Sequence, residues 1–350
     1  MRNRVSRVEV TNSVSEQEAG AGELDRAARA LETASNVALA CHVNPDPDAL
    51  GSMLGLASYL AERGKEVVCS WGNQPLARPR WLSALDGAGY LVDPKDFPEN
   101  PELLVSLDTA SPDRLGILAS NADRAAEVIV IDHHRTNPGF GTIVVLDPAA
   151  SSTAEIVFRL VERMGGRLSD GAAACLYAGV ITDTGRFMYE ATTPETFRVA
   201  GELRRHGFDH ARLGQALFED GSLGALKVTG IALDRLEHVP EADLVWTYVV
   251  QADLAGPGIP MGDTDDLIDH VRMAREADVA CVIKQQRDGW FKVSLRSRGR
   301  TDVGAICQAF GGGGHRLAAG YTSQAGLEET VRPLVEALVT ARREARHDHG

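Results

Sequence analysis

Short apolar runs alternate with longer amphipathic stretches through the first half of the chain. The apolar runs, rich in Val, Ile and Leu, predict buried strands at 36–41, 66–70, 102–108, 127–132 and 142–147. The stretches with a helical period predict helices at 48–64, 152–166 and 171–183. Because strands and helices alternate, the pattern favours an α/β fold with a mostly parallel sheet flanked by helices.

A second, smaller α/β domain is expected beyond a helical region. The pattern stays helical at 194–240, and a new alternation then begins with a strand at 243–250 and a helix at 263–276. A hairpin is expected around Asp288 and Gly289, followed by a short helix at 301–310. We therefore expect a tail at 1–22, a first domain at 23–193, a helical connector at 194–240, a second domain at 241–342 and a tail at 343–350.

The composition is that of an ordinary globular protein, and it narrows the functional classes. Of the 350 residues, 44% are hydrophobic and 24% charged, and the net charge of −13 offers no bulk positive field to a long nucleic acid. The five cysteines form no CxxC pair, which argues against a zinc–thiolate site and for a reducing compartment. Neither a membrane-spanning run nor the apolar core of a secretory signal is visible. We expect a cytoplasmic protein without a membrane partner.

Carboxylates and imidazoles follow several of the predicted strands and one predicted helix. They are His42, Asp46, Asp48, Asp108, Asp132, His133, His134 and Asp183. Ligands of open α/β sheets bind beyond the carboxyl ends of the strands, so residues far apart in sequence can converge there. Crowded carboxylates repel one another unless cations neutralise them, and a set of oxygen and imidazole ligands without thiolate suits hard divalent ions. We expect two divalent ions, with Mn²⁺ favoured and Mg²⁺, Co²⁺ or Fe²⁺ as alternatives.

Each of these segments also has an ordinary structural explanation. Asp48 precedes a predicted helix and can act as its cap, and Asp108 can cap a turn with Thr109 and Ser111. The glycine run at 311–314 can be a simple hinge. The occurrence of all the segments in one chain, in order, favours the metal-binding interpretation over these alternatives.

The order of the segments resembles a known family. The stretches HVNPDPD, SLD, IDHH and GVITDTGRF resemble the DHH phosphoesterase superfamily, and KVSLRSRG followed by FGGGGHRLAAG resembles the DHH-associated domain. Together they cover nearly the whole chain except the N-terminal tail. The subgroup that the chain resembles is the nanoRNase type of bifunctional oligoribonucleases and pAp phosphatases, whose relatives include cyclic di-AMP phosphodiesterases.

The resemblance implies roles for individual residues. One ion would be bound by His42, Asp46 and Asp108, and the other by Asp48, Asp108, His133 and Asp183. His134 would face the substrate phosphate, Asp132 would orient an imidazole, and Arg135 would assist. Two ions that share a water can lower its pKa and direct it at phosphorus, so no covalent enzyme intermediate is needed.

The second domain is expected to hold the substrate. Residues 284–300 carry six Lys or Arg side chains against the single acid Asp288, a local reversal of the overall charge. A glycine-rich loop can offer its backbone N–H groups to a phosphate. The candidate substrate contacts are Arg296, Ser297, Gly312, Gly313, Gly314, His315 and Arg316. The resemblance places the active site in the cleft between the domains, where short substrates fit.

We expect a phosphodiesterase acting on short RNA and on linear or cyclic dinucleotides such as pApA and cyclic di-AMP, with 3′-phosphatase activity on pAp. A homodimer is compatible with the resemblance. One alternative is a pyrophosphatase or exopolyphosphatase of the same superfamily. Another is a module that binds nucleotides without cleaving them.

Overall fold

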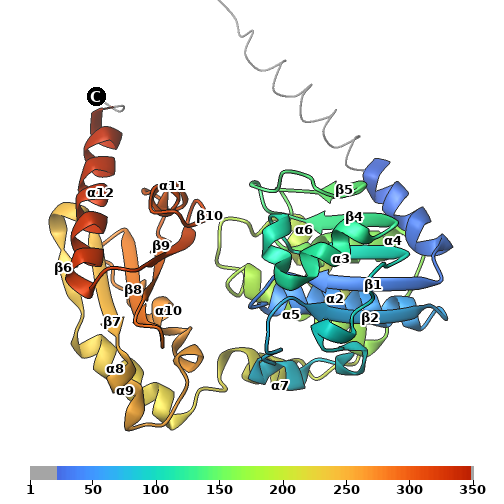
Figure 1. Ribbon diagram of the computed structural model, residues 1–350, viewed down its shortest axis with the longest axis horizontal. Helices are drawn as coiled ribbons and strands as arrows, with labels where there is room; N and C mark the ends of the chain where they lie inside the picture. The colour runs from blue at the N-terminus through green and yellow to red at the C-terminus, as the bar shows by residue number, and fades with distance from the viewer. Residues whose placement is uncertain (1–21, 348–350) are drawn as a thin grey trace, which may run out of the picture. The chain divides into compact units, whose positions relative to one another are not determined.

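The computed structural model describes residues 22–347, which divide into two compact units between Asp220 and Gly221. The N-terminal tail predicted at 1–22 therefore lies almost wholly outside the described residues. Figure 1 shows the elements of each unit. No helix in the described part of the chain is long and apolar enough to cross a membrane.

The first unit is an α/β domain, as the alternating pattern predicts. After a helical stretch at 22–33, its main elements are β1 (Asn36–Cys41), α2 (Pro47–Ala61), β2 (Glu66–Trp71), β3 (Leu103–Leu107), η4 (Pro112–Leu118), α3 (Ala119–Arg124), β4 (Glu127–Asp132), β5 (Ile143–Leu146), α4 (Thr153–Arg163), α5 (Asp170–Asp183), α6 (Pro194–Leu203) and α7 (His210–Phe218). Short 3₁₀ helices lie at Arg80–Ala84, Ala88–Tyr90 and Pro94–Asp96.

The strand order of this unit determines where a ligand can bind. The five strands are parallel, in the order β2-β1-β3-β4-β5. The chain reverses its winding direction between β1 and β3, so the connections that leave these neighbouring strands run to opposite sides. In doubly wound sheets this switch point opens a crevice at the carboxyl ends of the strands. The residues after Cys41 and Leu107 lie at that point.

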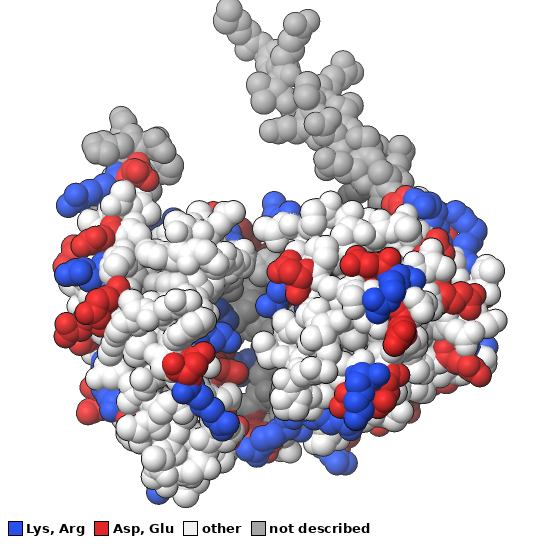
Figure 2. Space-filling model, viewed as in Figure 1, with Lys and Arg blue, Asp and Glu red and all other residues white. Residues whose placement is uncertain are grey.

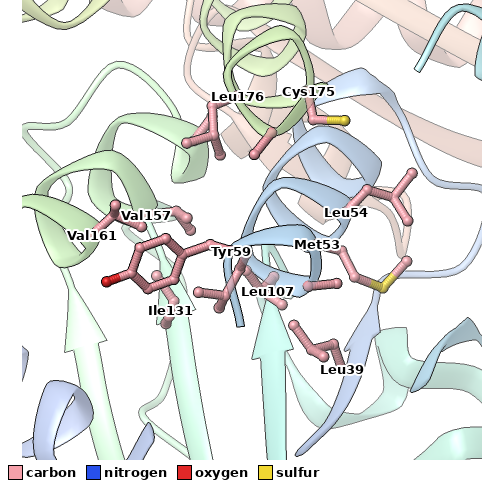
Figure 3. Close-up of a cluster of buried hydrophobic side chains, with 14 of the residues drawn as sticks. Leu39, Met53, Leu54, Tyr59, Leu107, Ile131, Val157, Val161, Cys175 and Leu176 are labelled. Atoms are coloured by element: carbon pink, nitrogen blue, oxygen red, sulfur yellow. The ribbon is translucent and has the colours of Figure 1, made fainter. Parts of the chain in front are cut away.

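Both faces of the sheet are covered, which explains why its strands are continuous apolar runs. Alternate strand residues such as Leu39, Leu107 and Ile131 join α2, α4 and α5 in the larger core. Figure 3 shows these three side chains together with Tyr59 and Leu176 in that cluster. The intervening residues pack on the other face with Phe97, Leu115 and Leu118.

Glycines allow α2 and α5 to pack closely. A Cβ at Gly51 would lie 2.3 Å from the carbonyl oxygen of Cys175, so no larger residue fits without displacing backbone. A Cβ at Gly179 would lie 2.5 Å from Asp48 Oδ1 and 2.7 Å from Ala154 Cβ. The close contact at Gly179 fixes α5 against the start of α2, so the end of α5 lies near the carboxyl ends of the strands.

The second unit contains a mixed sheet. Its elements are α8 (Leu223–Asp234), β6 (Glu237–Val239), β7 (Leu244–Val249), α9 (Gln251–Ala255), α10 (Leu267–Val271), β8 (Val279–Gln285), β9 (Phe291–Ser297), α11 (Val303–Ala309), β10 (Gly313–His315), β11 (Ala318–Ser323) and α12 (Leu327–His347), with 3₁₀ turns at Pro240–Ala242 and Met261–Thr264. The strand order is β10-β11-β9-β8-β7-β6, with only β7 and β8 parallel in this sheet.

Several elements of this unit differ from the sequence prediction. The helix expected at 263–276 is shorter, because a 3₁₀ turn ending at Thr264 precedes α10 (Leu267–Val271). The glycine-rich stretch contributes strands β10 and β11, whose weak apolar pattern gave no strand signal. The helix α12 continues to His347, so residues 343–347, expected as part of a tail, are helical. The hairpin at Asp288 and Gly289 is present, and Gly289 has a φ of 88°.

Candidate active site

The segment after β1 brings His42 to the edge of the sheet. His42 is buried, and its Nε2 lies 3.6 Å from Asp46 Oδ2 and 3.5 Å from Asp108 Oδ2. Its Nδ1 lies 2.9 Å from the carbonyl oxygen of Val43 and 3.2 Å from Arg114 Nη2. Asn44, at a φ of 53°, donates its N–H to Asn73 Oδ1 at 2.6 Å, which anchors the loop.

Asp46 and Asp48 begin α2, and they combine the cap function with a place in the site. Asp46 is the N-cap, and its Oδ1 accepts the N–H of Ala49 at 3.0 Å while Oδ2 faces His42. Asp48 is buried, and its Oδ1 accepts a bond from Ser52 Oγ at 3.3 Å. The cap role predicted for Asp48 is therefore wrong: Asp46 caps the helix, and Asp48 lies inside its first turn.

Asp108 lies between the other groups, directly after β3. It has a φ of 54°, an uncommon conformation for a residue with a side chain, and it is buried. Its Oδ2 faces His42, whereas its Oδ1 lies 3.6 Å from His133 Nε2 and 3.6 Å from His134 Nδ1. One carboxylate thus lies beside three imidazoles, one at Oδ2 and two at Oδ1.

The segment after β4 supplies the two histidines. His133 Nε2 lies 3.3 Å from Asp183 Oδ2 at the end of α5. Asp132 is fully buried, and its Oδ1 lies 2.7 Å from His134 Nδ1. Asn137 donates its amide to Asp132 Oδ2 at 2.6 Å, which fixes the carboxylate that orients His134. Arg135 is exposed in the following turn.

Of three groups in the described part of the first unit that could each hold a cation, two contain the ligands proposed from the sequence, and the third consists of Asp108, Asp132 and His134. The first is His42, Asp46 and Asp108, and the second is Asp48, His133 and Asp183; within each group the ligand atoms lie within 4.8 Å of one another. All six residues proposed as ligands from the sequence are therefore in one of these groups. Asp108 also contacts His133 of the second group, which suits it to a bridging position.

The charges of this site are unbalanced in the protein alone. Burial and the charge of Asp108 raise the pKa values of Asp48 and Asp183 well above the usual range. Burial would raise the pKa of Asp108 too, but a bond from His42 and the nearby His134 hold it well below that range. Burial opposes protonation of His134, yet its bond to Asp132 raises its pKa to about 9.

This set of donors fits divalent cations. Buried carboxylates that lose stability when charged would gain it from a cation between them. The donors are oxygens and imidazole nitrogens, and the cysteines of the chain are buried free thiols. Such a donor set suits Mn²⁺, Mg²⁺ and similar ions better than thiophilic metals.

The second unit contains the proposed substrate residues. Arg296 is partly exposed near the end of β9, His315 is the exposed last residue of β10, and Arg316, which follows it, is also exposed. Ser297 is buried, and its hydroxyl donates to Asp278 Oδ2 at 3.0 Å and accepts the N–H of Gly299 at 3.0 Å. Its hydroxyl therefore supports the turn after β9.

The glycine run has a structural role in this unit. A Cβ at Gly312 would lie 2.2 Å from the carbonyl oxygen of Gly320, and Gly314 has a φ of 140°. A Cβ at Gly313 would meet nothing within 4 Å. Close packing thus requires Gly312 and Gly314, whereas Gly313 leaves open space. The basic run 284–300 is not one exposed face, because Lys284 is buried and paired with Asp265.

Two residues of the site were missed at the level of sequence. Asn137 lies five residues after Asp132, and Thr153 is the first residue of α4. The spacing of Ser152 and Glu155 is typical of a helix start, so it predicts that Thr153 begins a helix. It does not predict which residues Thr153 contacts. In the second unit, nothing in the sequence distinguished Asp278, which organises the turn that contains Ser297.

Comparison with known proteins identifies both units. Residues 36–180 match the model of the DHH family N-terminal domain, and residues 244–341 match the DHHA1 domain. The bifunctional oligoribonuclease and PAP phosphatase NrnA of Thermus thermophilus is 35% identical over 303 residues, which cover 86% of this chain and 88% of that protein. The cyclic-di-AMP phosphodiesterase GdpP of Geobacillus thermodenitrificans is 30% identical over 321 residues, 85% of this chain but 46% of that protein.

A solved structure supports the same assignment. The exopolyphosphatase-related protein of Bacteroides fragilis has a TM-score of 0.85 and 25% sequence identity, and the match covers 93% of this chain and 98% of that one. The α/β fold and the family resemblance predicted from the sequence are both confirmed. The chain belongs to the DHH family and combines its N-terminal domain with a DHHA1 domain.

Proposed function

We propose that this protein is a metal-dependent phosphodiesterase that cleaves short oligoribonucleotides and linear or cyclic dinucleotides, such as pApA and cyclic di-AMP, to 5′-mononucleotides. The same site would remove the 3′-phosphate of pAp. The observation that carries the proposal is the convergence of two possible ligand groups on the edge of one sheet, with Asp108 contacting both. The relatives named as oligoribonuclease, PAP phosphatase and cyclic-di-AMP phosphodiesterase support the substrate class.

The ligands would be divided between two cations. His42, Asp46 and Asp108 would hold one, and the other would be held by Asp48, Asp108, His133 and Asp183. Two divalent ions, of which Mn²⁺ is favoured, would supply charge for the phosphate oxygens and would lower the pKa of a shared water.

His134 would act directly on the substrate phosphate. Its Nδ1 lies 2.7 Å from Asp132 Oδ1, which orients the ring. A pKa of about 9 keeps the imidazole protonated near neutral pH, so the ring would offer positive charge to a phosphate oxygen. Asn137 and Asp132 would keep this orientation fixed through turnover. Arg135, exposed next to His134, would add positive charge.

The DHHA1 domain would provide the remaining contacts. Arg296, His315 and Arg316 carry cationic or titratable groups, and Gly313 leaves room for a ligand beside the backbone. Ser297 would contribute by supporting the turn that follows Arg296. Figure 2 shows acidic and basic side chains interspersed over the face in view, and the net charge of −13 offers no bulk positive field to a long nucleic acid. A cytoplasmic location and a homodimer remain predictions.

A second candidate is hydrolysis of pyrophosphate or polyphosphate. It is favoured by the match to the exopolyphosphatase-related protein of Bacteroides fragilis, which covers both units. Both candidates need the same cations, so metal dependence alone does not separate them.

A panel of substrates separates the candidates. Protein stripped of metal and supplied with Mn²⁺ would be given pApA, cyclic di-AMP, pAp, pyrophosphate and polyphosphate separately, and initial rates of product release would be compared. We expect AMP from pApA and pAp, and pApA or AMP from cyclic di-AMP. Hydrolysis of pyrophosphate or polyphosphate, without hydrolysis of the nucleotides, would support the second candidate function instead. Tight nucleotide binding without any turnover would indicate a sensing module.

A further inference from the structure

The N-terminus of α4 points at the carboxylates of the candidate site. Ser152 is the N-cap, and its hydroxyl accepts the N–H of Glu155 at 3.1 Å. The N–H groups of the next two residues have no partner within the helix. They donate instead to Asp48: Thr153 N–H to Oδ2 at 2.7 Å, and Ala154 N–H to Oδ1 at 2.9 Å.

Thr153 makes a second contact with the site through its side chain. Its hydroxyl donates to Asp108 Oδ1 at 2.9 Å, so one residue binds two carboxylates with two different donors. Thr153, Asp48 and Asp108 are all buried, at 0%, 1% and 2% exposure, so water does not replace these bonds. A threonine inside a helix usually bonds to the carbonyl four residues earlier, but at the first position of α4 no such helical carbonyl exists.

We propose that Thr153 is a positioning residue that couples the two cation sites. The inference rests on the proposed function, which assigns Asp48 to one cation and Asp108 to both. The backbone of Thr153 fixes Asp48, and its hydroxyl fixes the rotation of Asp108. Asp108 meets His42 through Oδ2 and His133 through Oδ1, so a rotation of its carboxylate would disturb both sites together.

The substitution Thr153→Val isolates the side-chain contact. Valine has nearly the same shape, and it leaves the backbone N–H to Asp48 in place. Removing a hydrogen-bond partner of a metal ligand typically costs about 10–100-fold in metal affinity. We therefore expect the Kd for Mn²⁺ to rise by about 10–100-fold for both ions, whereas Thr153→Ser, which keeps the hydroxyl, should bind within about threefold of wild type.

A matched control is available at Thr196 of α6, whose partner Glu155 lies on α4. Thr196 is also fully buried, and its hydroxyl donates to the buried carboxylate of Glu155 at 3.0 Å, outside the candidate site. Thr196→Val therefore removes the same type of bond, and we expect unchanged Mn²⁺ affinity. Thr153→Ala provides a second loss of the hydroxyl should the valine variant fail to fold.

The experiment is a Mn²⁺ titration of the full chain, followed by electron paramagnetic resonance of free Mn²⁺, with circular dichroism to verify folding. Weaker binding in Thr153→Val or Thr153→Ala, with normal binding in Thr153→Ser and Thr196→Val, would support the inference. Saturating Mn²⁺ should also restore kcat to within about threefold of wild type, as expected for a residue that acts only through the metal ligands.

Two results would overturn the inference. One is wild-type affinity in the folded Thr153→Val or Thr153→Ala variant, and the other is an equal loss of affinity in Thr196→Val. A wild-type protein that binds no Mn²⁺ would instead refute the proposed function itself, so the two failures are distinguishable.

Discussion

The substitution Gly179→Ala tests whether close packing between helices determines the position of a metal ligand. Gly179 lies in α5, one turn before Asp183, and faces the start of α2. An added Cβ would be 2.5 Å from Asp48 Oδ1 and 2.7 Å from Ala154 Cβ, below any ordinary contact distance. Asp48 cannot easily move away, because Thr153 and Ala154 hold both of its oxygens.

Two opposing effects determine how much Gly179→Ala changes the free energy of unfolding. Alanine is favoured over glycine within a helix by roughly 1 kcal/mol. Inserting a methyl group into a well-packed interior typically costs about 1–3 kcal/mol. The expected net loss in the free energy of unfolding is therefore at most about 2 kcal/mol. Because Asp48 is displaced, we also expect the affinity for Mn²⁺ to fall by about tenfold or more.

The assay combines urea denaturation of the metal-free protein with a Mn²⁺ titration of the folded variant. Gly55→Ala is a suitable control for the metal site, because the atoms nearest to its added Cβ belong to Leu176 and Ala172 and not to a metal ligand. The control should lose a comparable amount of stability but bind Mn²⁺ normally. If Gly179→Ala binds Mn²⁺ with wild-type affinity, the reasoning that α5 packing positions Asp48 is refuted.

Three further predictions concern the second unit. Asp278 is buried and accepts hydrogen bonds from Ser297 Oγ, Arg300 N and Thr301 N. Asp278→Ala should therefore lower the free energy of unfolding, measured by urea denaturation, by about 3 kcal/mol. A loss below about 1 kcal/mol would contradict this prediction. Burial would raise the pKa of Asp278, but its bonds to Thr301, Arg300 and Ser297 hold the pKa below the usual value. The charged Asp278 therefore stabilises the folded protein above the pKa of about 4 that an aspartate has in the unfolded chain, and this stabilisation is lost as the pH falls through the lower pKa of the folded state. Below about pH 4, the free energy of unfolding should therefore fall more in the wild type than in Asp278→Asn. Lys284 is buried and paired with Asp265, so Asp265→Ala would leave its charge without this partner and should lower the free energy of unfolding by about 1–2 kcal/mol. Lys284→Met removes the buried charge itself and should lower the free energy of unfolding by less than about 1 kcal/mol. A larger loss for Lys284→Met than for Asp265→Ala would contradict this prediction.

The fold of the first unit was accessible from sequence because its strands are buried on both faces. Runs such as Glu127–Asp132 read as continuous apolar segments, and the structure has a strand with those bounds. The second unit was harder. Strands β10 and β11 are short or rich in Gly and Ala, so their pairing defines them rather than their own composition: β11 pairs with β9, and β10 pairs with β11.

The candidate site was accessible for a different reason. His42, Asp108 and His133 each follow a strand directly, so the parallel topology brings them together. The residues that hold these ligands in place could not be predicted from the sequence, because their contacts join segments that are far apart in the chain. Thr153 lies 45 residues from its partner Asp108, and no local pattern encodes that contact.

Ser297 shows that a role assigned to a residue from a sequence motif can differ from the role its surroundings give it. Its neighbour Arg296 is partly exposed, whereas Ser297 is buried and bonded to Asp278. Strand alternation places consecutive side chains on opposite faces, so two adjacent residues in one motif need not share one role.

The central claim is that Asp108 joins two cations in one hydrolytic site, and the most direct test measures Mn²⁺ stoichiometry and pApA turnover in wild type and in Asp108→Ala. We expect two bound Mn²⁺ ions and AMP release for the wild type. For the variant we expect weakened binding at both positions and turnover reduced to background, because the carboxylate that lies beside His42 of one ligand group and His133 of the other is gone. Near-normal AMP release by Asp108→Ala in the presence of Mn²⁺ would contradict the account.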